Sequence, residues 1–268
     1  MRLGISTKVL RDYPLSEAIE IAHRCGYRDM EFWVDDLLTA DLSLDEIIAK
    51  TDVYGIHRNV HLLTEDLNIA SFNQAIRDVS VQQHMEGIRL AGQLGAETAT
   101  LHPGRKTAKT RTMEAAWEVQ LDSIRRLAEC AAESGVILCV EAMEKLAGEI
   151  VLDGNDLDFI AKRLAGQKAL AFTLDISHLH TNGEVCQQMA LAKHLQIGNV
   201  HISQSKGLKP HLTLFDPAGE IDFRTVFPEL ATFYDGPMVI EGYVAGKGME
   251  IAEKSILWYA EIMEEVGK

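Results

Sequence analysis

Short runs of aliphatic and β-branched residues alternate along the chain with longer amphipathic segments, and this alternation constrains the fold most. The short runs occupy residues 2–6, 29–33, 55–61, 97–102, 136–141, 170–175, 197–202 and 237–241. The amphipathic segments occupy residues 15–25, 43–51, 72–95, 112–135, 155–166, 186–195, 223–234 and 249–266. Strands that alternate with helices indicate repeated βα units and a parallel sheet. Eight such units without a linker predict an α/β protein, a single (β/α)8 TIM barrel spanning residues 1–268 as one domain. An open doubly wound sheet is the alternative.

Residues that favour helix ends lie near the borders of several expected helices. The candidate N-caps are Ser16, Ser43, Thr112 and Asn155. The glycines that follow helices are Gly26, Gly95, Gly135 and Gly166. The expected units therefore repeat as strand, loop, helix and glycine.

The charge balance is acidic, because 26 Lys and Arg stand against 40 Asp and Glu and give a formal net charge of −14. This balance argues against nucleic acid or an anionic membrane surface as the partner, and no apolar run is long enough to span a bilayer. One segment, 102–112, is locally basic and carries no acid. It would suit a phosphate or carboxylate, or it is simply a solvated loop. We expect a small-molecule partner, and the sequence leaves a homo-oligomer open.

The four cysteines are widely spaced and form no CxxC pair. This spacing argues against a disulfide framework and against a thiolate zinc site, so we expect core thiols. The N-terminal stretch MRLGISTKVLRDYP has no long apolar segment of the signal-peptide type. We therefore expect a cytoplasmic protein.

Six successive expected strands each end in His, Asp or Glu. In chain order these residues are His61, His102, Glu141, Asp175, His201 and Glu241. The carboxyl ends of the strands meet at one face of a (β/α)8 barrel, which is where we expect the active site. Three carboxylates and three imidazoles gathered in one pocket require a compensating positive charge. The pattern therefore predicts a divalent metal ion.

Each of these residues also has an ordinary explanation when it is taken alone. A single His at a strand end is more often a hydrogen-bonded structural residue than a ligand. Glu141 could pair with Lys145, and Glu241 could face solvent. The ordinary explanation must hold at six consecutive strands, however, so the metal site is the better prediction.

Several motifs resemble those of the xylose isomerase-like barrels, a group that includes sugar and sugar-phosphate isomerases and epimerases, inosose dehydratase-like lyases and endonuclease IV. The similarity covers nearly the whole chain. The motifs are VHLLTEDLNIAS (60–71), TLHPG (100–104), VEAM (140–143), LDISH (174–178), VHISQSKG (200–207), AGEIDF (218–223) and VIEGY (239–243).

The resemblance implies two sets of metal ligands. Glu141, Asp175, His201 and Glu241 correspond to the four ligands shared by most members of the group. His61 and His102, with Glu141 as a bridge, resemble the ligands of an additional metal in endonuclease IV. A third zinc of that enzyme uses the histidine of D-x-x-H, here His178, with an Asp-x-His pair that here reads Lys209-Pro210-His211. Lys209 in place of Asp weighs against the endonuclease interpretation. The Arg that epimerases usually carry six residues after the strand-seven His is Gly207 in this chain.

Two chemistries fit these residues. One ion (Mn, Mg, Co or Zn) would support proton transfer through an enediolate, with Glu141 and Glu241 as the acid–base pair and His178 orienting a hydroxyl. The same parts allow a dehydratase on a keto-sugar or keto-inositol. Two ions would make Glu141 a bridge and favour a phosphodiesterase.

We favour a sugar or sugar-phosphate isomerase or epimerase over the phosphodiesterase, and we give a non-enzymatic sugar-binding barrel little weight. The expected substrate-binding residues are Trp33, Arg105, Lys206, Lys209 and His211.

Overall fold

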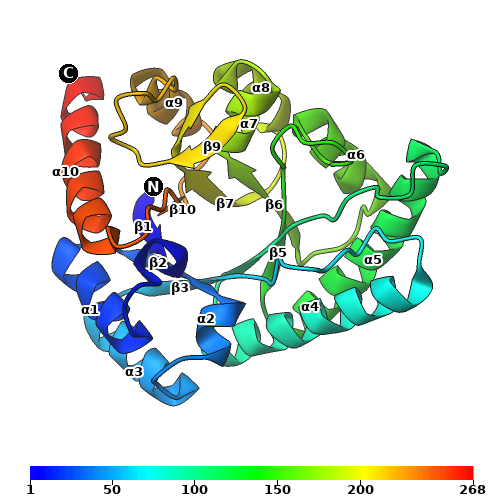
Figure 1. Ribbon diagram of the computed structural model, residues 1–268, viewed down its shortest axis with the longest axis horizontal. Helices are drawn as coiled ribbons and strands as arrows, with labels where there is room; N and C mark the ends of the chain where they lie inside the picture. The colour runs from blue at the N-terminus through cyan, green and yellow to red at the C-terminus, as the bar shows by residue number, and fades with distance from the viewer. Residues whose placement is uncertain (268) are drawn as a thin grey trace.

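The computed structural model describes residues 1–267 and shows a closed barrel of parallel strands. The barrel strands are β1 (Arg2–Ser6), β2 (Asp29–Trp33), β3 (His57–His61), β4 (Thr98–Leu101), β5 (Ile137–Glu141), β6 (Leu170–Asp175), β7 (Ile197–Ile202) and β10 (Pro237–Ile240). Each strand pairs with its neighbour in sequence order, and β10 pairs with β1 to close the ring (Figure 1). The (β/α)8 prediction is therefore confirmed, and the open doubly wound sheet is wrong.

Helices surround the barrel (Figure 1). They are η1 (Thr7–Leu10), α1 (Leu15–Cys25), α2 (Val34–Leu38), α3 (Leu44–Tyr54), α4 (Gln74–Leu94), α5 (Met113–Ser134), α6 (Gly154–Arg163), α7 (Ile176–Asn182), α8 (Val185–Ala192), α9 (Phe223–Leu230) and α10 (Gly248–Val266). The long helices α4 and α5 lie side by side, and α10 packs against α1 and α9. None of the helices within residues 1–267 has the length and apolar character needed to cross a bilayer.

Most expected elements are present, with boundaries that shift by a few residues. Ser43 and Thr112 cap α3 and α5 as expected. The expected caps Ser16 and Asn155 are wrong, because α1 begins after Pro14 and the side chain of Asp153 caps α6. Gly26, Gly95 and Gly135 adopt the left-handed conformation at helix ends, as expected.

Four elements were not expected: the helices η1, α2 and α7, and a hairpin formed by β8 (Gln204–Lys206) and β9 (Lys209–Leu212). Two of them follow barrel strands β6 and β7 directly and carry histidines to the face where those strands end.

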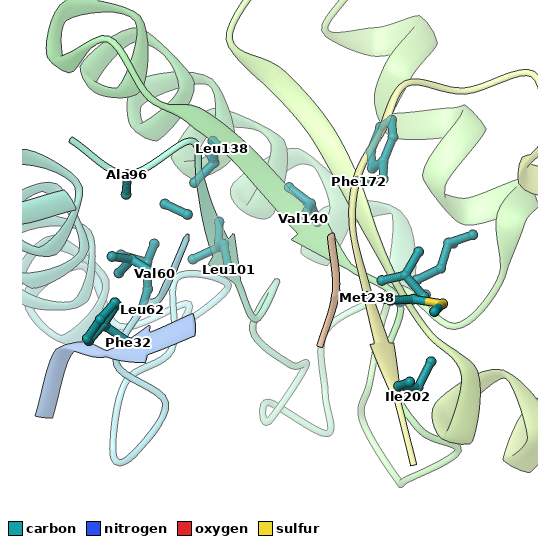
Figure 2. Close-up of a cluster of buried hydrophobic side chains, with 14 of the residues drawn as sticks. Phe32, Val60, Leu62, Ala96, Leu101, Leu138, Val140, Phe172, Ile202 and Met238 are labelled. Carbon is teal, nitrogen blue, oxygen red and sulfur yellow. The ribbon is translucent and has the colours of Figure 1, made fainter. Parts of the chain in front are cut away.

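Side chains alternate between the two surfaces of the barrel strands, as the pleat requires. Aliphatic and aromatic side chains of successive strands form the buried core, among them Phe32, Val60, Leu101, Val140 and Phe172 (Figure 2). The other surface is polar and faces the barrel interior. Thr100 on β4 contacts Thr173 on β6 at 3.2 Å although these strands are not neighbours, so both side chains must lie inside the ring.

Candidate metal centre

His201, at the end of β7, lies between two glutamates from other strands. Its Nδ1 is 3.1 Å from Oε1 of Glu141 on β5 and 3.4 Å from Oε2 of Glu241, which directly follows β10. All three side chains are buried, and Glu241 is 2% exposed. The alternative that Glu241 faces solvent is therefore wrong.

Glu141 contacts four imidazoles rather than Lys145, and one of them is His178, whose Nδ1 lies 3.6 Å from Oε1 of Glu141. Besides His201, its Oε2 lies 3.1 Å from Nε2 of His102 and 3.8 Å from Nε2 of His61. His61 and His102 pack edge to face, with ring centroids 5.0 Å apart. Glu141 is thus placed where it could bridge two ions, as its resemblance to the endonuclease ligand implies.

The two carboxylate oxygens of Asp175 have different environments. Oδ1 caps helix α7, because it accepts hydrogen bonds from the hydroxyl of Ser177 at 2.7 Å and from the backbone N–H of His178 at 2.9 Å. Oδ2 lies 3.8 Å from Nε2 of His178 and 3.8 Å from Nδ1 of His211. The cap fixes the carboxylate and leaves one oxygen for a ligand.

His178 and His211 meet over Asp175, with their Nε2 atoms 3.0 Å apart. His178 donates from Nδ1 to the carbonyl of Ala142 at 3.0 Å, which fixes the ring. His211 stands on β9 with a φ of 61°, a left-handed conformation that is uncommon for a residue other than glycine. The hairpin therefore brings His211 to Asp175 even though Lys209 replaces the expected Asp.

Glu31 is a member of the site that the strand-end pattern missed. It lies in the middle of β2, fully buried, with Oε2 3.1 Å from Nε2 of His201. Its Oε1 accepts hydrogen bonds from Nδ2 of Asn199 at 2.7 Å and from the hydroxyl of Thr100 at 3.1 Å. A glutamate within the otherwise apolar run DMEFW is the signal that could have found it.

Donor atoms for a metal ion fall into three groups, each within 4.8 Å: His61, Glu141 and His201; Glu31, His201 and Glu241; and Asp175, His178 and His211. His201 joins the first two groups. His211 links the second and third, because its Nδ1 lies 3.9 Å from Oε2 of Glu241 and 3.8 Å from Oδ2 of Asp175. The expected ligands therefore form one continuous cluster of donor atoms.

Four buried carboxylates of this cluster each keep one oxygen that accepts no well-oriented hydrogen bond within residues 1–267. These atoms are Oε2 of Glu31, Oε2 of Glu141, Oδ2 of Asp175 and Oε1 of Glu241. Such atoms cost free energy unless a cation compensates them. Carboxylate oxygens with an imidazole nitrogen suit Mn²⁺, Mg²⁺, Co²⁺ or Zn²⁺, so the residues fit a divalent ion.

The carboxylates and imidazoles shift one another's pKa. Burial would raise the pKa of Glu141, but His201, His102 and His61 outweigh it and hold that pKa well below its usual range. Burial would also raise the pKa of Glu241, but the positive charges of His201 and Lys8 outweigh burial and lower this pKa to about 2. Both glutamates are therefore ionised at neutral pH.

The expected substrate residues divide into two sets. Trp33 is buried and stacks on His61, with ring centroids 4.2 Å apart. Nζ of Lys8 lies over the Trp33 ring, 4.6 Å from its centroid. Lys206 and Lys209 pair with each other at the exposed tip of the hairpin. Arg105 is 57% exposed and lies 3.6 Å from Glu149. The structure brings Trp33 and His211 into contact with the expected site histidines, and Arg105 lines a cavity together with His102.

A sequence model of the xylose isomerase-like TIM barrel family matches residues 19–262. The chain belongs to this family. Among curated members, this xylose isomerase-like barrel is 27% identical over 250 residues to the uncharacterized protein MJ1188 of Methanocaldococcus jannaschii, covering 90% of this chain and 88% of that protein.

Solved structures share the same barrel. A D-tagatose 3-epimerase-like protein superposes with a TM-score of 0.87 at 23% identity, covering 100% of this xylose isomerase-like barrel and 98% of the other chain. The IolI protein with a bound zinc atom superposes with a TM-score of 0.81 at 17% identity, covering 99% and 98% of the two chains. At these identities the likeness establishes the fold.

Proposed function

We propose that this protein is a divalent-metal-dependent isomerase or epimerase of a small carbohydrate. The observation that carries the proposal is that Glu141 and Glu241, both ionised, approach the same nitrogen of His201, Nδ1, at 3.1 and 3.4 Å. The similarity to the D-tagatose 3-epimerase-like protein and to the zinc-containing IolI protein supports it.

Glu141, Asp175, His201 and Glu241 would hold the ion. His61 and His102 would bind a second ion if one were present. A bound divalent ion would polarise a substrate carbonyl and make the adjacent C–H more acidic. Ionised carboxylates are the form that a proton acceptor needs. Glu141 and Glu241 come from β5 and from the end of β10, so one can remove the proton from one face of the substrate and the other can return it to the opposite face.

His178 would orient a substrate hydroxyl. Its Nδ1 donates to the carbonyl of Ala142, so in the neutral ring Nε2 is an acceptor, and Nε2 points toward His211 and Asp175. His211 and Trp33 would contact the substrate from the opposite sides of the pocket. If the deprotonated substrate instead lost a β-hydroxyl as water, the same residues would catalyse a dehydration.

The proposal is tested by incubating the metal-loaded protein with a panel of ketoses and ketose phosphates in deuterium oxide. Deuterium should enter the carbon beside the carbonyl. Absence of exchange across the whole panel would contradict it.

One observation favours a second candidate function, a phosphodiesterase like endonuclease IV. His61 and His102 lie beside Glu141, and Asp175, His178 and His211 form a further group of candidate ligands. Nicking of a duplex that contains an abasic site, abolished by Glu141→Gln, would support this alternative. Failure to bind such a duplex at low ionic strength would dismiss it.

A further inference from the structure

A cavity of about 210 Å³ adjoins the metal centre between the loops that follow β3, β4 and β5. Two of its lining residues also touch the centre. His102 lies 3.1 Å from Glu141, and Oε2 of Glu144 lies 3.5 Å from Nε2 of His178. A ligand held at the centre can therefore extend into this cavity. Its volume is below the ~300 Å³ at which pockets for a whole small ligand begin, so it suits only one end of a substrate.

Hydrogen bonds fix the walls of this cavity. Asn68 clamps the turn after β4, because its Nδ2 donates to the carbonyl of Arg105 at 2.9 Å and its Oδ1 accepts from the N–H of Arg105 at 3.0 Å. From helix α5, Gln120 donates to the carbonyl of Pro103 at 2.8 Å. Gly104 passes Asn68 so closely that an added Cβ would lie 2.7 Å from Oδ1. The cavity is therefore a preformed feature of the barrel.

The charges around the cavity are unfavourable for an anion. Glu144 and Glu149 line it, and both side chains are largely buried. Its one lining cation, Arg105, is 57% exposed and lies 3.6 Å from Glu149. A phosphate placed here would meet the carboxylate of Glu144 and a cation, Arg105, that already lies beside Glu149. Like charges at short range repel strongly where water is scarce.

The polar atoms that lack partners suit hydroxyl groups instead. Among residues 1–267, Nδ1 of buried His84 and Oε2 of Glu144 have no hydrogen-bond partner. Burial lowers the pKa of His84 to about 4, so its imidazole is neutral at physiological pH. A carboxylate accepts from a hydroxyl, and a neutral imidazole can donate or accept. Leu67 and Ile69 supply an apolar wall for the C–H groups between such hydroxyls.

We propose that this cavity binds the uncharged, hydroxyl-bearing end of the substrate, so that the protein acts on a free sugar or polyol ketone rather than on its terminal phosphate. The proposal rests on the isomerase or epimerase function and names its substrate class. Glu144 repels the phosphate, and Glu149 holds Arg105, the cation that lines the cavity.

The test compares deuterium exchange into 2-ketohexoses and into their 6-phosphates, using the metal-loaded full chain. The free sugar should have a kcat/KM about tenfold higher than its phosphate, which corresponds to about 1.4 kcal/mol. Glu144→Gln removes the repelling carboxylate and Glu149→Gln releases Arg105, so each should raise the ratio of phosphate to free-sugar kcat/KM several-fold. Glu264→Gln, on the exposed part of α10, removes the same charge far from the cavity and should leave the ratio unchanged.

Each outcome is decisive. A wild-type preference for the phosphate overturns this inference and leaves the isomerase or epimerase function standing. Ratios that stay at the wild-type value in both cavity variants, with folding confirmed by circular dichroism, also overturn it. Exchange into neither class of sugar overturns the proposed function and this inference with it.

Discussion

Glu31 and His201 meet inside the barrel, with Oε2 of Glu31 3.1 Å from Nε2 of His201. The opposite nitrogen of the same ring, Nδ1, lies 3.1 Å from Glu141 and 3.4 Å from Glu241. A carboxylate on one nitrogen of an imidazole fixes the ring and raises the basicity of the other nitrogen. Glu31 therefore orients His201 for a metal ion at Nδ1.

Replacing Glu31 tests this orientation. Glu31→Gln should weaken binding of Mn²⁺ or Zn²⁺ by about 10–100-fold, the usual effect of removing the partner of a metal-binding histidine. Competition with a chromogenic chelator measures the affinity. Glu264→Gln, which removes an exposed charge elsewhere, should bind the ion like the wild type. Equal affinity in a folded Glu31→Gln variant would show that the contact does not position the ligand.

The number of ions separates the two chemistries. Proton transfer needs about one ion per chain, whereas metal-bridged hydrolysis needs about two or more. Elemental analysis of protein purified without chelator should give about one equivalent. Asp175→Ala should reduce this content, and His211→Ala should retain it. Two or three equivalents, with one lost in His211→Ala, would favour the phosphodiesterase.

The tight turn at Gly104 should be sensitive to a single methyl group. Gly104 has a φ of +76°, and an added Cβ would lie 2.7 Å from Oδ1 of Asn68 and 3.0 Å from the backbone of Ala70. Strained backbone alone costs about 1–3 kcal/mol, and the clash adds to it. Gly207 has a φ of +56° with open space around it, so Gly207→Ala carries the backbone strain without the clash. Urea unfolding should rank Gly104→Ala as the less stable variant, and equal stabilities would contradict the clash.

Glu149 should make stability depend on pH. Burial raises its pKa to about 7, so the folded state favours the protonated form. This contribution is favourable below the unfolded pKa of about 4.5 and is lost as the pH rises through 7. Glu149→Gln should therefore be more stable than the wild type by about 3 kcal/mol at pH 8 and nearly equal to it at pH 4.5, since each pKa unit is worth ~1.4 kcal/mol. Urea unfolding at both pH values gives the difference, and a difference that does not change with pH would refute the assignment.

The barrel and most of the site could be predicted because both follow from repetition. Parallel strands that end in His, Asp or Glu place those side chains on one face, and Glu141, Asp175, His201 and Glu241 do lie in one cluster. The strand-end pattern misses Glu31 because this residue lies in the middle of a strand. Only the structure shows that its side chain points into the barrel and reaches His201.

Other features depend on contacts between distant segments. The hairpin that carries His211 has strands of three and four residues, too short for a clear periodicity. The left-handed φ of His211 leaves no mark in the sequence pattern. The basic segment 102–112 suggested an anion site, but Arg105 lies beside Glu149, which is far away in sequence.

The central claim is metal-dependent proton transfer by Glu141 and Glu241. The most direct measurement is deuterium incorporation from deuterium oxide into a panel of ketoses, followed by NMR, with protein stripped of metal and then reloaded with Mn²⁺. Exchange should appear only in the reloaded protein, and Glu141→Gln and Glu241→Gln should each lower its rate by about 100-fold or more. A folded, metal-loaded protein that exchanges no ketose, or one that exchanges equally well after either substitution, would contradict the account.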